Sequence, residues 1–589
     1  MTNKKTSLLL FLLIFLTYAN ALGNGFIGDD NFLFLENNFY KNPRNLSKLF
    51  SKDFITKFSD IDPATSSVNT ISTSGCVSYR LITALSFFID NFFWKLNPHG
   101  FHLTNIVIHF FVSCLVYTLS LLIIKNENVA FFASLLFAVH PIQTEVVNNI
   151  GYRSDLLVTL FYLLAVIGFI KAEVHKKAVK SRYVWPLSSF FIALFSKETA
   201  ITLPIIFVIC DYLFLKRGHR FKEILVQRKF FYIAVSIILA FYLFIYFIVI
   251  PNSNRVDFSS FHVGTQILIA AKILFNNLLF LFWPPKVTVL PTLYAPPLEG
   301  IKSSDIIIVS IFLLLCAVVV RKSLKNHREI SFSILWFLVT YLPSSNLIPL
   351  PNPWAFRFMY LPSVGFFIFL AIAIEKGLIF LRKVGDHQGL GVVFKIILVG
   401  FYMINTIPLN EYFRNDQTAC QQMLKNYPDA AQPYKILGEI YYTQGHYNQA
   451  IPYFRKYLEK KSNNPFVEVM KEDYSIYHQI GVCFVHDPDK AIIEFKKAIA
   501  LRPDYALAHA DLAVAYLQKG EYSRALEYAL HSIDLQEQLL FGYIQAIKCY
   551  LKLNEPQKAE QLWQKVAALF PNDKIVEDLH KMIQGENVF

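Results

Sequence analysis

Apolar stretches alternate with short polar loops through the first 410 residues of the chain. Many of them approach the roughly 20 residues that an α-helix needs to cross a bilayer. The pattern therefore predicts a polytopic, all-α membrane domain over residues 1–410. Eleven stretches are expected to cross, near residues 7–22, 102–124, 129–147, 154–171, 184–196, 198–215, 230–250, 305–320, 331–349, 358–381 and 392–409.

Positive charge orients these spans, because short loops rich in Lys and Arg stay on the cytoplasmic side. Four loops are strongly basic: residues 171–182, 216–229, 321–328 and 382–395. Placing all four inside puts the N-terminus in the cytoplasm and the C-terminal part outside. A further apolar stretch, 264–283, must then enter and leave by one face or lie along the interface. Residues 23–100 form a long first external loop.

Beyond residue 410 the chain becomes polar and repeats itself with a period of 34 residues. Small residues recur where paired helices would touch, with aromatic residues beside them. This pattern predicts about four tetratricopeptide repeats over 411–589, stacked as an α-solenoid with a concave groove. The segment 415–428 resembles a half-repeat that docks the array on the membrane domain. The repeat positions include Gly438, Phe454, Gly481, Phe495, Ala513, Ala529, Ala546 and Ala559.

Composition narrows the class of protein. Apolar residues make up 54% of the chain, and the net charge is +13. The basic residues lie at span ends and not on one soluble face, which argues against nucleic-acid binding. The seven cysteines are scattered without CxxC spacing, so neither a zinc site nor a disulfide framework is indicated. The first apolar segment is either a span or a signal peptide cleaved after Ala19-Asn20-Ala21.

Two adjacent carboxylates, Asp29 and Asp30, follow the first apolar segment in the sequence GNGFIGDDN. One interpretation is a pair of solvated acids at a helix end. The other is a general base whose pKa is tuned by partial burial beside the membrane.

Cations also flank spans on the predicted external side, where loop charge should be sparse. A lipid phosphate or similar anion would account for them. Local pairing is the alternative: Arg153 with Asp155 or Glu145, and Lys197 with Glu198. His140 either donates a hydrogen bond to the same ligand or caps a helix. The candidate anion-binding residues are Arg80, His140, Arg153, Lys197 and Arg357, with Glu145, Asp155 and Glu198 beside them.

Several motifs occur in a fixed order: GDD, SYR, NPHGFHLTNIVIHF, LLFAVHPIQTEVV, GYRSDLL, SKETAIT, LPSSNL and RFMYLPSVG. With the repeats that follow, they resemble the TMTC-type family of transmembrane and tetratricopeptide-repeat O-mannosyltransferases, in the GT-C superfamily. The resemblance covers nearly the whole chain. The chain differs from the animal members of this family, because it has only about four repeats where they have more, and because its first external loop contains a polar insertion.

The resemblance implies an inverting transfer of a sugar, usually mannose, from a polyprenyl-phosphate carrier to Ser or Thr hydroxyls of an extracytoplasmic protein. It assigns the general base to Asp29 or Asp30 without separating them. The external cations would stabilise the departing phosphate. No metal or other cofactor is expected. The bacterial cytoplasmic membrane is favoured over the endoplasmic reticulum, and the repeats would hold an acceptor protein or an assembly partner.

Two other classes of function stay open. A membrane-anchored repeat scaffold with an inactive core would bind partners without transferring sugar. A lipid-linked sugar flippase or polymer ligase would use the same external phosphate site without making a glycopeptide.

Overall fold

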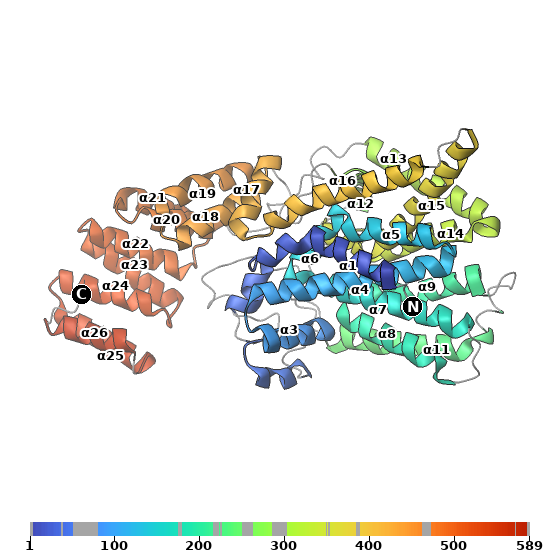
Figure 1. Ribbon diagram of the computed structural model, residues 1–589. Helices are drawn as coiled ribbons and strands as arrows, with labels where there is room; N and C mark the ends of the chain where they lie inside the picture. Colours follow the sequence, from blue (N-terminus) through green and yellow to red (C-terminus); the bar gives the residue numbers. More distant parts are fainter. Residues whose placement is uncertain are drawn as a thin grey trace. The chain divides into compact units, whose positions relative to one another are not determined.

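The structure is a computed structural model of the 589-residue chain. It describes residues 4–36, 39–50, 80–174, 180–215, 223, 226–249, 263–284, 303–348, 350, 354–384, 389–461, 473–571 and 573–585. The polar insertion TSSVNTISTSG lies outside these residues. The chain divides into two compact units, Met1–Asn426 and Tyr427–Phe589. We call them the membrane unit and the repeat unit. Figure 1 labels the helices of each unit.

The described residues of the membrane unit form helices joined by short irregular segments and contain no strand, as the apolar pattern predicts. Helix α3 (Leu81–Trp94) and the short α6 (Thr144–Asn148) lie between longer apolar helices, and α17 (Asp416–Asn426) ends the unit. The other helices are α1 (Lys4–Tyr18), α4 (Pro98–Ile124), α5 (Glu127–Val139), α7 (Arg153–Val174), α8 (Val184–Ser196), α9 (Leu203–Cys210), α11 (Lys229–Phe244), α12 (Val263–Phe282), α13 (Ser303–Asn326), α14 (Arg328–Tyr341), α15 (Tyr360–Val384) and α16 (Leu390–Tyr412).

The chain is a multi-pass membrane protein. Eight helical segments of its described part are long and apolar enough to cross a membrane, and a bent pair raises the number to nine. The two remaining predicted spans fall on α8, which has 13 residues, and α14, which has 14. Each predicted span thus falls on a helix, and the number of crossings stays a prediction.

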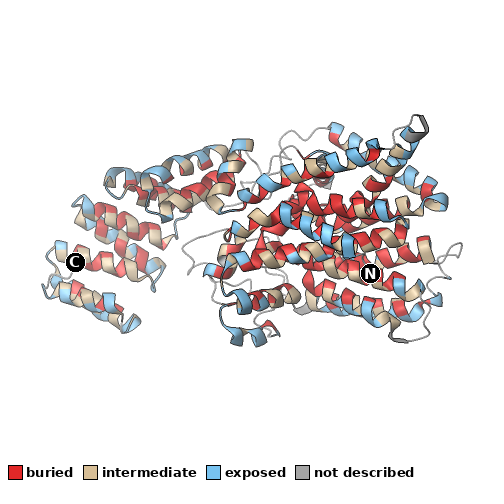
Figure 2. Cartoon of the chain, viewed as in Figure 1, coloured by how far each residue is buried: buried red, intermediate tan, exposed pale blue. Residues whose placement is uncertain are grey.

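Burial separates the inner helices from the outer ones (Figure 2). In the span that contains α7, 56% of the apolar window is buried within the protein, against 11% in the span that contains α13. Lipid tails can cover the apolar side chains that α13 exposes. Helix α7 instead packs against α4 and α8, so it forms the centre of the unit.

The bent pair is a break in one span, at the motif AVHPIQTEVV. Helix α5 ends at Val139, because Pro141 has no N–H to continue the helix. A 3-10 turn (Pro141–Gln143) and α6 follow, at 52° to α5. Irregular backbone inside a membrane protein needs internal hydrogen-bond partners. The Thr406 hydroxyl of α16 supplies one, donating to the carbonyl of Val139 over 2.7 Å.

The repeat unit confirms the predicted tetratricopeptide architecture. Its helices pair in chain order, and close packing within a pair depends on small residues. A Cβ atom on Gly438 would lie 2.6 Å from the Phe454 ring, and one on Gly481 would lie 2.5 Å from the Phe495 ring. The pairs are α18 (Ala431–Thr443) with α19 (Tyr447–Lys461), α20 (Asp473–Cys483) with α21 (Pro488–Leu501), α22 (Ala506–Gln518) with α23 (Tyr522–Leu535) and α24 (Leu540–Lys552) with α25 (Pro556–Leu569).

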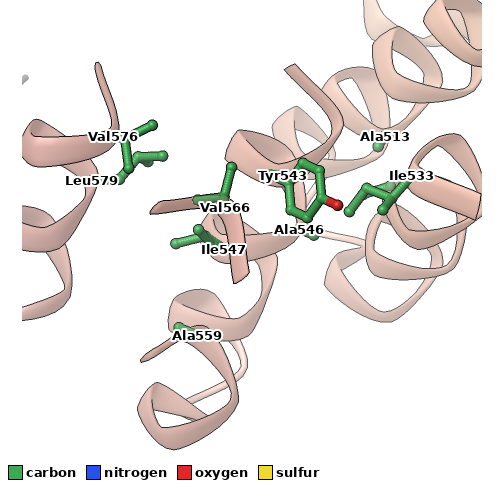
Figure 3. Close-up of a cluster of buried hydrophobic side chains, with 10 residues drawn as sticks. Ala513, Ile533, Tyr543, Ala546, Ile547, Ala559, Val566, Val576 and Leu579 are labelled. Atoms are coloured by element: carbon green, nitrogen blue, oxygen red, sulfur yellow. The ribbon is translucent and has the colours of Figure 1, made fainter. Parts of the chain in front are cut away.

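A single helix, α26 (Lys574–Ile583), follows the fourth pair. Its Val576 and Leu579 join a buried apolar cluster that also contains Tyr543 and Val566 (Figure 3). Helix α26 therefore covers the apolar face that the last pair would otherwise expose to water.

Candidate functional site

The two carboxylates of the GDD motif have different surroundings. They lie in a short segment, residues 25–31, that we call the acid loop; it is irregular up to Gly28, becomes helical at Asp29 and leads into a π-helix (Asn31–Glu36). Asp30 is fully buried, and its carboxylate accepts hydrogen bonds from the backbone N–H of Gly151 at 2.6 Å and of Ile150 at 3.2 Å. Asp29 is half-buried. The sequence did not separate the two acids, and this difference in exposure distinguishes them.

The environment of Asp30 favours its protonated form. Burial raises the pKa of Asp30 to about 7, while the hydrogen bonds from Gly151 and Ile150 act in the opposite direction. The neighbouring charge of Asp29 adds to the rise. Through its hydrogen bonds with Ile150 and Gly151, Asp30 holds the acid loop against the turn that leads into α7.

An asparagine network holds the segment that leads into the acid loop. The side chain of Asn24 donates to the Asn148 side chain at 3.1 Å and to the Asn410 carbonyl at 2.8 Å. Asn148 donates in turn to the Asn410 side chain at 2.8 Å, which donates to Asn20. The network joins the end of the first span, the broken span and α16. The spacing of these asparagines follows no motif, so the sequence does not predict the network.

The structure brings six predicted charged residues together as three ion pairs. The Lys197 ammonium donates to both oxygens of Asp155 at 2.7 Å. The Arg80 guanidinium donates to both oxygens of Glu198, at 2.8 and 3.2 Å. We call the full set the charge cluster: Arg80, Glu145, Asp155, Lys197, Glu198 and Arg357.

The third pair closes the broken span. Arg357 donates from its side chain to Glu145 at 2.7 Å and from its backbone N–H at 3.0 Å. Glu145 lies on α6, so the interruption of the helix is what places this carboxylate against Arg357. Both side chains are buried. Removing one partner would therefore leave an uncompensated charge.

Two residues connect the three pairs. Asp155 interacts electrostatically with Arg80 and Arg357 as well as with Lys197. The Phe358 ring lies 5.0 Å from the Arg357 guanidinium and 5.6 Å from the Lys197 ammonium. The pairs therefore form one electrostatic unit.

Tyr152 links the charge cluster to the acid loop. Its ring lies 4.1 Å from the Arg357 guanidinium, and it belongs to the turn Ile150–Tyr152, whose Ile150 and Gly151 N–H groups bind Asp30. The motif GYRSD thus contributes Tyr152 as well as its charges, a role that the sequence does not predict.

The pairing predicted from neighbours in the sequence is wrong. Lys197 pairs with Asp155 and not with Glu198, while Arg153 pairs with Asp90 at 2.6 Å. The partners lie on different helices, and sequence distance does not reveal them. Burial lowers the pKa of Lys197, and the charge of Asp155 opposes that effect.

Two residues predicted to bind phosphate have structural contacts instead. Arg153 is fully buried and donates to the Asn105 side chain at 2.7 Å and to the Phe101 carbonyl at 3.1 Å. His140 is also fully buried, and its Nδ1 accepts the Ile142 N–H, so it caps the turn that breaks the span. Arg153 joins α3 to α4 and α7, and His140 stabilises the break.

Of the four predicted cations, Arg80 has the most exposed side chain, at 16%, and its partner Glu198 is 38% exposed. Arg357 and Lys197 are 4% and 5% exposed. An anionic ligand would therefore meet the Arg80 edge of the cluster first. The described residues contain no group of His, Cys, Asp and Glu side chains arranged to hold a metal ion.

Comparisons with known proteins match both units. A family model described as "Tetratricopeptide repeat" matches residues 417–465, and one described as "TPR repeat" matches 488–520. The human protein O-mannosyl-transferase TMTC3 is 24% identical over 612 aligned residues, covering 94% of this chain and 63% of that protein. The chain is similar to TMTC-type proteins over nearly its whole length.

Two further relatives agree. The Caenorhabditis elegans protein O-mannosyl-transferase F38B6.6 is 26% identical over 382 residues, covering 63% of this chain and 51% of the relative. Human TMTC1 is 37% identical over 136 residues, covering 21% of this chain and 15% of that protein. The chain spans less than two thirds of the length of each relative. These relatives come from animals, so they do not support the preference for a bacterial membrane.

Proposed function

We propose that this protein is an integral-membrane O-mannosyltransferase. It transfers mannose from a polyprenyl-phosphate carrier to Ser or Thr hydroxyls of extracytoplasmic protein, with inversion at the sugar. One observation carries the proposal: a half-buried carboxylate, Asp29, lies on a loop that is bound to the turn Ile150–Tyr152, and the Tyr152 ring contacts a cation of the charge cluster. The names of the TMTC-type relatives support the reaction class.

Asp29 is the proposed general base. A serine or threonine hydroxyl is a weak nucleophile, so a base must take its proton as the oxygen bonds to the anomeric carbon. Asp30 suits this role less, because it is fully buried and its oxygens accept two backbone N–H groups. Asp30 instead holds the loop, and Asp29 keeps the exposure that an acceptor needs.

The charge cluster is the proposed site for the phosphate of the donor. As the bond between the anomeric carbon and the phosphate oxygen breaks, its electron pair leaves with the phosphate. Arg80, Lys197 and Arg357 stabilise that negative charge. Because the cations are already paired with carboxylates, the cluster is nearly neutral, and the phosphate enters at the exposed Arg80–Glu198 edge. The concave groove of the repeat unit is proposed to bind an acceptor protein or assembly partner, which raises the local concentration of that protein at the site.

The direct test is sugar transfer by the purified chain in liposomes. The substrates are a polyprenyl-phosphate mannose and a Ser/Thr-rich peptide, with the glycopeptide detected by mass spectrometry. Asp29→Asn should lower kcat by roughly 10²–10⁴. Asp504→Asn, the same change at an exposed residue in the turn between α21 and α22 and outside the proposed groove, should leave kcat unchanged.

Three outcomes contradict the proposal in different ways. Equal transfer by Asp29→Asn and the unaltered chain would exclude Asp29 as the base. Movement of the lipid donor across the bilayer without glycopeptide would favour a flippase. Partner binding without either activity would favour a scaffold.

A further inference from the structure

The acid loop is bound by α17, the helix that follows the last span. Asp416, the first residue of α17, accepts two hydrogen bonds from the loop. One comes from the backbone N–H of Gly28 at 2.7 Å, and the other from the Asn31 side chain at 2.8 Å. A third bond joins the Gly25 N–H to the Arg414 carbonyl at 3.0 Å. Segments almost 400 residues apart in sequence therefore lie side by side.

Apolar packing supports the same contact. Ile27, which is fully buried, packs against Phe413, Ala419 and Met423. The contact between loop and helix is thus a packed interface with polar bonds at its edge.

The start of α17 is arranged so that Asp416 is available to the loop. The Asn415 side chain caps the helix by accepting the Thr418 N–H at 2.8 Å. Asp416 is not needed for that cap and turns its carboxylate to Gly28 and Asn31. A negative charge in the first turn is also favourable for the helix dipole.

The bonds to Asp416 bracket the two acids. Gly28, with φ +54°, takes a left-handed conformation that favours glycine, and its N–H is held by Asp416. Asn31 is held by the other oxygen of the same carboxylate. Between them, Asp30 is bound on its other side by Ile150 and Gly151. Asp29 is therefore carried on a backbone that α17 and the start of α7 fix from two directions.

We propose that Asp416 is a positioning residue that sets the placement of Asp29, and that α17 is the helix through which the acid loop is held. This inference rests on the proposed function for its consequence for the reaction. Asp416 touches neither donor nor acceptor in this proposal. It acts through the backbone of Gly28 and the side chain of Asn31.

The expected effect is on turnover and not on donor binding. Asp416→Asn keeps one acceptor oxygen and replaces the other with an NH2 group that cannot accept, so the bonds from Gly28 and Asn31 can no longer form together and the loop is held less firmly. A misplacement of about 1 Å at a reacting group can cost ~100-fold in rate. Asp416→Asn should therefore lower kcat roughly 10- to 100-fold, with the donor KM changed less than about twofold. Asp504→Asn is the matched control.

Hydrogen–deuterium exchange tests the contact without relying on activity. Asp416→Asn should speed exchange of the Gly28 amide in peptides covering residues 24–31, and Asp504→Asn should not. If Asp416→Asn does not fold, Asn31→Ala removes only one of the two donors and should show the same changes at smaller size.

Each outcome decides between the two proposals. Faster exchange with a lower kcat and constant donor KM supports the inference. Unchanged exchange, or faster exchange with unchanged kcat, overturns it while leaving the proposed function standing. An unaltered chain that transfers no sugar overturns the proposed function, and this inference with it.

Discussion

Two lysine–aspartate pairs in this chain have the same Nζ–Oδ distance of 2.7 Å in opposite surroundings. Lys197 and Asp155 in the membrane unit are 5% and 8% exposed, whereas Lys490 and Asp487 in the repeat unit are 62% and 40% exposed. The first pair joins residues 42 positions apart, and the second joins residues three apart. Water screens the second pair, so equal geometry does not imply equal energy.

The comparison extends to the two units. Helices of the repeat unit pack mainly on their neighbours in sequence, and a regular pattern of small residues is sufficient for that. The candidate site instead needs a broken span, irregular loops and ion pairs between distant segments. Exposed charged residues of the repeat unit, such as Lys490, can change at little cost, while those of the charge cluster depend on one another.

The largest difference should appear when each lysine is removed. Lys197→Ala leaves Asp155 buried without its partner, which should lower the free energy of unfolding by about 3–5 kcal/mol. Lys490→Ala should change it by less than about 0.5 kcal/mol. SDS-induced unfolding in mixed micelles, followed by circular dichroism, compares them. Equal destabilisation of the two variants would refute the distinction.

A pH series probes Asp30. Burial raises the pKa of Asp30 to about 7 in the folded state, so the folded state binds this proton more tightly than the unfolded state does. The stability gained from this difference is complete below the ordinary pKa of Asp and is lost as the pH rises through 7. Asp30→Asn lacks this dependence. Between pH 4 and pH 8, the stability of the variant relative to the unaltered chain should therefore rise by up to about 4 kcal/mol. Unfolding curves that stay parallel across this range would contradict the prediction.

The repeat unit can be disturbed where its helices approach most closely. Gly481→Leu forces a side chain into the Phe495 ring, which should cost about 1–3 kcal/mol. The control is Gly377→Leu on α15, where a Cβ atom would meet nothing within 4 Å. Thermal unfolding of both variants measures the difference. A harmless Gly481→Leu would mean that the helix pair tolerates a wider separation.

The smallest expected effect concerns the broken span. Thr406→Val keeps the side-chain shape but removes the donor to the Val139 carbonyl, at a cost of about 1 kcal/mol. Hydrogen–deuterium exchange around residues 139–148 should also rise. Unchanged stability and exchange would show that the break does not depend on this bond.

The sequence predicted the parts of the site better than their connections. Motifs led to Asp29, Asp30, Arg80, Lys197 and Arg357. They did not lead to the asparagine network, to Tyr152 or to Asp416. No local spacing marks these residues, because their roles arise from contacts between segments that are far apart in the chain. His140 and Arg153 show the opposite failure. Each stands out in the sequence as a polar group beside an apolar span, but the sequence does not reveal that both are buried and have structural contacts.

Hydropathy and periodicity by themselves determined that this chain is a multi-pass, all-α membrane protein followed by tetratricopeptide repeats. Those features depend on interactions within one helix or between consecutive helices. Only the tertiary structure decided which carboxylate each cation meets and that Asp30 is sealed while Asp29 is half-buried. The physical reason is that pairing energy and desolvation depend on neighbours in space, and in the membrane unit those neighbours lie tens to hundreds of residues away.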